Sequence, residues 1–189
     1  MARSRIHAQT LGFKPSLMAK PIPYGRQNIS PADIAATIKT LRSPYLTQGP
    51  AIEAFERSVC AWSGAKYGVA VMNGTVALHL AYAAAGIRPG DEILMPANTF
   101  VATANAALYL GAKPVFVDIE PGHFNLDPTQ LKKHLTKKTR AIVPVHFAGH
   151  PVDMNPILRF AKRHKLIVIE DAAHALGARY HKSRIGSLK

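Results

Sequence analysis

An acidic residue and a histidine follow an apolar run late in the chain. Residues 167–177 read Ile-Val-Ile-Glu-Asp-Ala-Ala-His-Ala-Leu-Gly, which is typical of a buried strand followed by small residues. In open α/β sheets ligands bind beyond the carboxyl ends of the strands, so Asp171 is placed for chemistry. A buried carboxylate needs a cationic partner, such as a protonated heteroaromatic nitrogen, although a structural salt bridge with a capping role would also explain it. His174 lies three residues further on and could reach the same ligand.

A second candidate site is the tripeptide 73–75, Asn-Gly-Thr, which joins an apolar run to a helical pattern. Gly74 allows close backbone approach, and the first amides of the helix, together with the Thr75 hydroxyl, would form an anion site. An ordinary turn with threonine as the N-cap explains the same residues. The tripeptide belongs to neither a Walker motif nor a Gly-x-Gly-x-x-Gly fingerprint.

The other chemistry-bearing residues are one aromatic side chain and a set of histidines. Phe100 stands just past a strand end at a helix start, where it either packs in the core or forms a flat wall for a planar ligand. His146 and His150 are four residues apart, but Gly149 and Pro151 preclude a regular helix between them, so we predict no metal site. A Ser-His-Asp hydrolase is unsupported because no Gly-x-Ser-x-Gly elbow occurs.

These residues are positioned by elements that alternate between helix and strand after Pro21. The expected strands are near-continuous apolar runs, as in parallel sheets that are covered on both faces. The sequence therefore predicts an α/β domain with a mainly parallel sheet and helices on both faces. The pattern predicts helices over 31–41, 52–62, 76–85 and 101–110, two basic helices after Asp127-Pro128 and Asn155-Pro156, and strands over 67–72, 92–95, 114–118, 141–146 and 166–170.

Composition narrows the class of partner and compartment. The net charge of +13 raises the possibility of nucleic-acid binding, but the main clusters of basic residues fall in 132–140 and 159–165, on the expected outer faces of amphipathic helices. Without a stacking or helix-turn-helix motif, we interpret them as solvated faces and predict no nucleic-acid partner. Cys60 is the only cysteine, which predicts no disulfide and a reducing, cytoplasmic compartment. No apolar run is long enough for a membrane span.

Residues 1–20 form a basic extension that contains no acidic residue and no signal-peptide core. It is interpreted as a disordered arm, a weak transit-like segment or translation upstream of a natural start at Met18. Organised patterning begins near Pro21, so residues 21–189 are expected to hold the folded part.

Three parts of pyridoxal 5′-phosphate match these candidate residues. Its phosphate suits Gly74 and Thr75, its ring face suits Phe100, and its ring nitrogen suits Asp171. On these residues and on longer motifs the chain resembles the DegT/DnrJ/EryC1/StrS family of nucleotide-sugar aminotransferases. The resemblance covers residues 21–188 and implies the large domain of fold type I pyridoxal-phosphate-dependent aminotransferases. The motifs that carry it are Pro23–Gln27, Leu46–Pro50, Asn73–His79, Thr99–Asn105, Pro144–Gly149 and Glu170–Ala178.

The resemblance implies a role for each matching residue. Gly74 and Thr75 would bind the cofactor phosphate, Phe100 would stack on the pyridine ring and Asp171 would pair with the ring nitrogen. His174 would lie near the ring hydroxyl. The residues implied for the nucleotide-sugar site are Tyr24, Pro44, Tyr45, Leu46 and Thr47.

The resemblance also implies a reaction, in which L-glutamate supplies an amino group that reaches a UDP-linked 4-keto sugar. Within the family, residues 23–27 and 46–49 are most similar to transaminases that form UDP-4-amino-4,6-dideoxy-N-acetyl-β-L-altrosamine in pseudaminic acid biosynthesis. Full-length members are expected to be homodimers. A pyridoxal-phosphate-dependent sugar dehydratase, and a non-catalytic regulatory or interaction protein on the same scaffold, are the alternatives.

The sequence departs from the family pattern near Lys189. The family's Schiff-base lysine belongs to a Ser-Phe-His-x-x-Lys motif expected shortly after Ile185–Ser187. That motif does not occur, and Lys189 is not assigned the role, so no catalytic residue is predicted. We expect a truncated N-terminal part of the large domain, inactive and poorly folded alone. Its strand over 67–72 should stand apart from the rest of the sheet with exposed edges.

Overall fold

The computed structural model describes residues 26–187, so the predictions for residues 1–20, Tyr24 and Lys189 lie outside the described residues. The chain forms two compact units that meet between Leu46 and Thr47 in the sequence. The first unit contains α1 (Pro31–Leu41). Ser30 caps this helix: its hydroxyl accepts the Asp33 N–H, and the Asp33 carboxylate accepts the Ser30 N–H at 2.7 Å.

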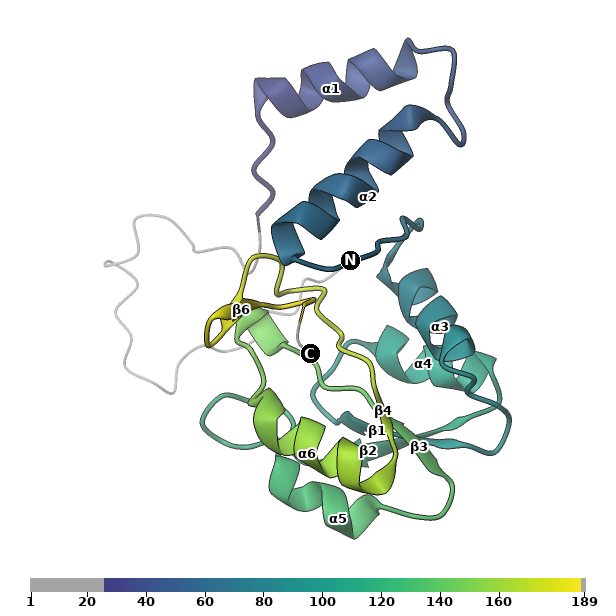
Figure 1. Cartoon of the computed structure of the whole chain (residues 1–189), viewed down its shortest axis with the longest axis vertical. Helices are drawn as coiled ribbons and strands as arrows, with labels where there is room; N and C mark the ends of the chain where they lie inside the picture. Colours follow the sequence, from purple (N-terminus) through teal and green to yellow (C-terminus); the bar gives the residue numbers. More distant parts are fainter. Residues whose placement is uncertain (1–25, 188–189) are drawn as a thin grey trace, which may run out of the picture. The chain divides into compact units, whose positions relative to one another are not determined.

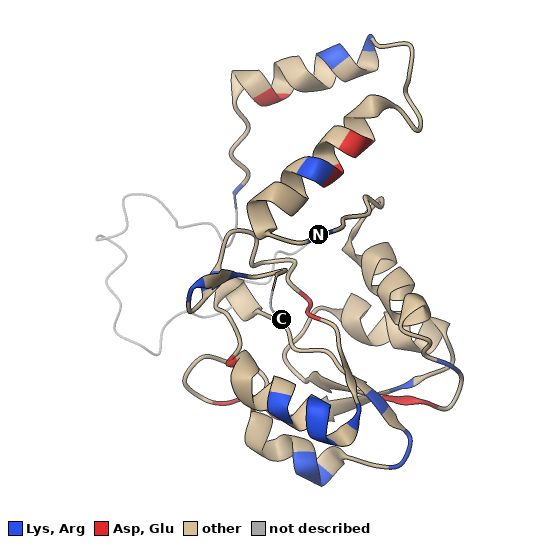
Figure 2. Ribbon diagram, in the orientation of Figure 1, with Lys and Arg blue, Asp and Glu red and all other residues tan. Residues whose placement is uncertain are grey.

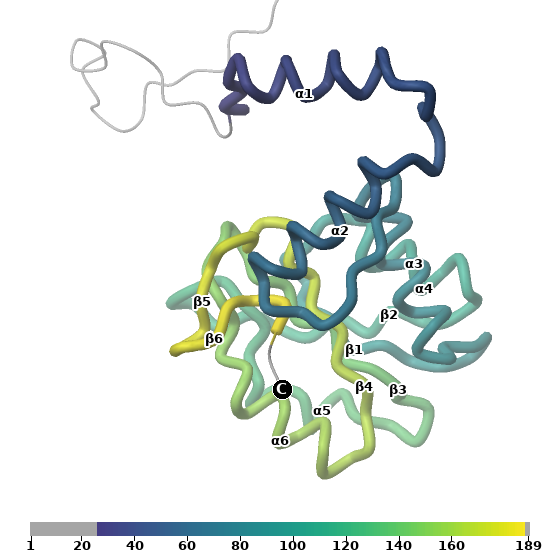
Figure 3. Tube along the Cα trace, turned by 45° about the horizontal axis from the view of Figure 1, so that its top comes forward, coloured from purple at the N-terminus to yellow at the C-terminus, as the bar shows by residue number. Residues whose placement is uncertain are grey.

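The second unit is built on a four-stranded sheet in which every pair of neighbouring strands is parallel (Figures 1 and 3). The strand order is β2-β1-β3-β4. This confirms the predicted parallel α/β architecture. The strands are β1 (Glu92–Pro96), β2 (Lys113–Val117), β3 (Thr139–Ile142) and β4 (Ile167–Val168).

Helices cover both faces of this sheet, also as predicted (Figure 1). Ile93 and Met95 of β1 pack in one core with α3 (Gly74–Ala84) and α4 (Val101–Tyr109). Leu94, between them, packs in the opposite core with α5 (Leu131–His134) and α6 (Met154–His164), because side chains alternate along a strand. The remaining elements are α2 (Pro50–Ser63), the 3₁₀ turns Pro128–Gln130 and Phe147–Gly149, and the hairpin β5 (Arg179–Tyr180) and β6 (Ser183–Arg184).

The predicted strand over residues 67–72 is wrong. The segment forms no strand, so the sheet contains four strands where the sequence predicted five. Tyr67, Val69 and Met72 are each about 80% exposed, because a strand needs a hydrogen-bonded neighbour and this segment has none among residues 26–187. The expected separation of the segment from the sheet is confirmed.

The basic residues of α5 and α6 lie on exposed helix faces (Figure 2). Lys132, Lys133, Lys162 and Arg163 are exposed, while the apolar residues of the same helices, such as Ile157, are buried. The interpretation as solvated helix faces is therefore confirmed for these residues. No helix in the described part of the chain has the length and apolar character needed to cross a membrane.

Candidate functional site

Asp171 is held at the carboxyl end of β4 by main-chain hydrogen bonds. Its N–H donates to the oxygen of Pro144 at 2.9 Å, and its own oxygen accepts from the N–H of His146 at 3.1 Å. These bonds extend the parallel pairing of β3 and β4 beyond the regular strands. Asp171 is buried and only 9% exposed. The predicted strand-end position is confirmed.

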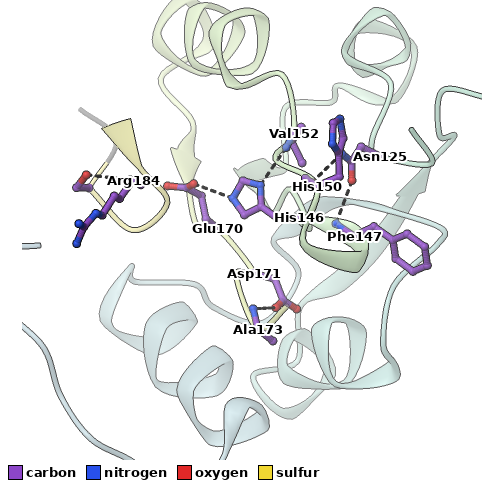
Figure 4. A network of polar contacts seen from close by, with 10 residues as sticks. Asn125, His146, Phe147, His150, Val152, Glu170, Asp171, Ala173 and Arg184 are labelled. Atoms are coloured by element: carbon purple, nitrogen blue, oxygen red, sulfur yellow. Dashed lines mark hydrogen bonds and ion pairs between the residues drawn. The ribbon is translucent and has the colours of Figure 1, made fainter. Parts of the chain in front are cut away.

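The Asp171 carboxylate is satisfied by neutral donors. Thr103 donates its hydroxyl to Oδ2 at 2.8 Å. The Ala173 N–H donates to Oδ1 at 3.2 Å (Figure 4). Because the Thr103 proton is used here, the Thr99 hydroxyl at 2.8 Å must be the donor to Thr103. Within residues 26–187 no cation pairs with Asp171, so the salt-bridge interpretation is wrong and a buried negative charge lacks its counter-charge.

Asp171 faces a mostly apolar cavity of about 160 Å³. An engineered apolar cavity of about 150 Å³ is known to hold a benzene molecule, so this space can hold one six-membered aromatic ring. A buried carboxylate beside such a ring would favour a protonated ring nitrogen. The lining residues are Gly74, Leu78, Thr99, Phe100, Ala102, Val145, Phe147, Asp171, Ala173 and His174.

Phe100 and His174 lie at the mouth of this cavity. Phe100 precedes the first turn of α4 and is 71% exposed, so the core interpretation is wrong and the ring is free to form a wall. His174 is exposed, and its ring stands edge-on to that of Phe147 with 6.4 Å between centroids. The cavity therefore brings together two of the predicted residues with Asp171.

Gly74 is the first residue of α3 and also lines the cavity. The N-cap is Asn73, whose Oδ1 accepts the Val76 N–H at 2.9 Å, so the threonine-cap interpretation is wrong. A Cβ added at Gly74 would meet no atom within 4 Å, which leaves open space over the helix end. The first amides of a helix lack intrahelical partners and favour anions. Thr75 lies in the same first turn but does not line the cavity.

The predicted nucleotide-sugar residues remain predictions. Pro44, Tyr45 and Leu46 belong to the first unit and Thr47 begins the second. Thr47 does not line the cavity. In the described part of the chain no lysine lines it either, and no group of three His, Cys, Asp or Glu residues is arranged to hold a metal.

Sequence reasoning missed the residues that support Asp171. Thr103 is fully buried, and Tyr82, also fully buried, donates its hydroxyl to the Thr103 carbonyl oxygen at 3.0 Å. The spacing of Thr99 and Thr103, one helical turn, could have indicated that the two hydroxyls share a face. Nothing in the local sequence indicates the contact of Thr103 with Asp171.

Tyr82 gives the first testable prediction. Burial, and secondarily the charge of Asp171, raises the pKa of the Tyr82 phenol above its usual value. The unfolded chain therefore loses this proton first, and we expect stability to fall as the pH rises above about 10. Alkaline titration, followed by tyrosinate absorbance, should show one tyrosine that ionises only on unfolding. Tyr82→Phe should remove that step, whereas Tyr109→Phe, at a 59% exposed position, should retain it.

The sequence matches known proteins across most of its length. The model of the DegT/DnrJ/EryC1/StrS aminotransferase family matches residues 27–189. Spore coat polysaccharide biosynthesis protein SpsC of Bacillus subtilis (strain 168) is 44% identical over 88% of this chain. A pleiotropic regulatory protein of Geobacillus stearothermophilus is 44% identical over 86% of this chain. GDP-perosamine synthase of Caulobacter vibrioides is 50% identical over 74% of this chain. The chain spans 38–44% of these three relatives.

Solved structures share the fold. DesV of S. venezuelae, in complex with a ketimine intermediate, has a TM-score of 0.80 and 42% identity over 82% of this chain and 42% of that one. NtdA of Bacillus subtilis with bound cofactor PMP has a TM-score of 0.74 and 40% identity, covering 76% of this chain and 33% of NtdA. DesI, in the presence of its TDP-sugar product, has a TM-score of 0.76 and 38% identity over 82% of this chain and 39% of DesI.

Proposed function

Because the chain belongs to the DegT/DnrJ/EryC1/StrS aminotransferase family, we propose that its cavity binds pyridoxal 5′-phosphate for amino transfer to a nucleotide sugar. The observation that carries the proposal is Asp171, a buried carboxylate that no cation among residues 26–187 pairs with, facing an apolar space the size of one aromatic ring. A pyridinium nitrogen would supply the missing charge. The names of GDP-perosamine synthase and of the DesI structure with its TDP-sugar product support sugar chemistry.

The residues present fit this cofactor. Asp171 would hold a proton at the ring nitrogen, and Thr103 would keep the carboxylate in one orientation. Phe100 would cover the ring face, and the first amides of α3 at Gly74 and Thr75 would bind the phosphate. When bound, pyridoxal phosphate supplies the electron sink of the reaction.

His174 would lie near the ring hydroxyl, at the open side of the cavity. No residue of this chain is given the Schiff-base role, so the chain would hold pyridoxal phosphate by non-covalent contacts. We propose amino transfer itself for a whole protein that contains this cavity.

The finer assignments rest on the sequence motifs alone. We propose L-glutamate as amino donor and a UDP-linked 4-keto sugar as acceptor, on the route to pseudaminic acid, with Tyr24 and residues 44–47 beside the nucleotide. The names of GDP-perosamine synthase and of the DesI structure show that relatives differ in the nucleotide. A homodimeric state and a cytoplasmic location are part of the same proposal.

The direct test is binding of pyridoxamine 5′-phosphate to the purified chain. This probe carries the ring, the ring nitrogen and the phosphate, but no aldehyde, so it cannot react with the chain's surface lysines. We expect saturable binding at one site, measured by the fluorescence of the probe. Broadening of Asp171 and Gly74 resonances in NMR spectra would place it in the cavity. An absence of saturation, or binding elsewhere, would overturn the proposal.

A regulatory protein is the second candidate function, since one relative bears the name pleiotropic regulatory protein. Such a protein could keep the cofactor cavity, so probe binding does not separate the two functions. Transfer of a ¹⁵N label from glutamate to a sugar does. The assay must use a whole protein that contains both this cavity and a Schiff-base lysine. Label in the sugar then supports the aminotransferase, and its absence despite cofactor binding favours the regulator.

Phe100→Leu should weaken binding of pyridoxamine phosphate about fivefold, because aromatic stacking contributes about 1 kcal/mol beyond simple burial. Phe100 is 71% exposed, so the free energy of unfolding should change little. Phe116→Leu is the matched control, since Phe116 is 50% exposed on β2 and does not line the cavity. Equal loss of affinity in both variants would contradict a stacking role.

A further inference from the structure

His146 is a fully buried histidine that does not line the cavity. Its Nε2 lies 2.9 Å from Oε2 of Glu170, and its Nδ1 lies 3.0 Å from the backbone nitrogen of Val152 (Figure 4). The Glu170 side chain is 19% exposed. Both ring nitrogens are thus engaged, one by the strand end that carries Glu170 and one by the chain that leads into α6.

The partners determine which nitrogen carries the proton. The Val152 N–H can only donate, so Nδ1 of His146 must accept and carries no proton. The proton of the neutral ring is then on Nε2, where it is donated to the Glu170 carboxylate. A second proton on Nδ1 would point at the Val152 N–H. The arrangement therefore requires the neutral Nε2–H form of His146, with Glu170 as the acceptor.

This pair is linked through the main chain to two residues of the cavity. The His146 N–H donates to the backbone oxygen of Asp171 at 3.1 Å. The next residue, Phe147, donates its N–H to Oδ1 of the buried Asn125 at 3.1 Å. Phe147 and Asp171 both line the cavity. The two loops also touch, because a Cβ added at Gly149 would lie 3.0 Å from the backbone oxygen of His174.

We propose that His146 and Glu170 are positioning residues whose hydrogen bond sets the direction of the Asp171 carboxylate. The bond ties the loop after β3 to the residue that precedes Asp171, and so prevents the two strand ends from sliding. Neither side chain lines the cavity, so the pair acts through Asp171. The inference rests on the proposed function, since the contact that it serves is the one to the ring nitrogen.

The first experiment uses the full chain without cofactor. His146→Leu and Glu170→Leu should each speed hydrogen exchange of the Asp171 and Ala173 amides about tenfold, as expected when a hydrogen bond to a charged group is lost. His146→Gln and Glu170→Gln keep a donor and an acceptor at these positions and should preserve protection. His164→Leu, at an exposed histidine of α6, is the control. Unchanged exchange at Asp171 in both leucine variants would overturn the inference.

A second experiment separates positioning from general damage to the fold. The probes are pyridoxamine phosphate and its analogue with C–H in place of the ring nitrogen. His146→Leu should weaken binding of the first about tenfold and of the second less than about twofold, because only the first uses the charge of Asp171. Glu170→Gln should restore affinity relative to Glu170→Leu. Equal losses for both probes would show that the pair merely supports the fold.

The two experiments fail in distinguishable ways. If the wild-type chain binds neither probe, the proposed function is wrong, and the exchange rates of Asp171 and Ala173 still decide whether the pair holds the strand end. If the chain binds the first probe normally in every leucine variant, the pair does not position Asp171. Long-range ¹H–¹⁵N spectra should show the Nε2–H tautomer of His146 in the wild type, and the other tautomer would contradict the inference.

Discussion

Asp171→Asn should weaken binding of pyridoxamine phosphate about 100-fold, which corresponds to about 2.7 kcal/mol. A hydrogen bond to a charged partner contributes about 1.5–3 kcal/mol, and the mostly apolar cavity favours the upper part of that range. Asparagine has the same shape but no charge, so it no longer stabilises a protonated ring nitrogen. Fluorescence titration measures the affinity, and the ¹⁵N shift of a ring-labelled probe should move toward that of neutral pyridine.

The stability of this variant should change by less than about 1 kcal/mol, because two effects oppose each other. Asparagine removes a buried charge that no cation in the described part of the chain pairs with, but its amide group must face one of the donors, Thr103 or Ala173. Asp118→Asn is the matched control: Asp118 directly follows β2, is exposed and does not line the cavity. Normal affinity in Asp171→Asn would remove the main support for the proposed function.

Gly74→Asp should abolish detectable binding of the probe, a loss of about 100-fold or more, while leaving the fold intact. The new carboxylate would stand at the first turn of α3, where the helix end and the open space above Gly74 would otherwise receive the phosphate. Repulsion between charges about 4 Å apart near a protein surface amounts to about 4 kcal/mol before screening by salt.

The same substitution should raise the melting temperature slightly, because an acidic residue in the first helical turn stabilises a helix by about 0.3–1 kcal/mol. Ala51→Asp is the control, since it adds the same charge to the exposed first turn of α2 outside the cavity. Calorimetry should show similar stability for both variants, with probe binding lost only in Gly74→Asp. Retained binding in Gly74→Asp would exclude the α3 terminus as the phosphate site.

Most elements of the fold were predictable because their signals are local. The helix over 31–41 forms at its predicted position, and β1 and β2 fall where the apolar runs predicted them. The segment 67–72 carries the same apolar signal as the other strands but has no partner, so pattern alone predicted a strand that does not form. Strand formation requires a hydrogen-bonded neighbour, and that neighbour is not encoded in the segment itself.

The candidate site was predictable in position but not in its interactions. Gly74 begins α3, Phe100 directly precedes α4, and Asp171 and His174 lie in the segment that follows β4. The cavity brings the four together. Three open alternatives were decided only by contacts: Phe100 is exposed, Asn73 caps α3, and Asp171 lacks an ion pair among the described residues. Thr75 shares the first turn of α3 without lining the cavity, so its role stays a prediction.

The sequence by itself determined the parallel α/β architecture and placed an acid, an aromatic ring and a glycine at the ends of its elements. These features depend on periodicity and on neighbours within a few residues. Only the tertiary structure decided that Thr103, 68 residues away, orients Asp171, and that His146 binds Glu170 as the Nε2–H tautomer. Each of these contacts joins segments distant in the chain, and their partners are chosen when the strands pair and the helices pack on the sheet.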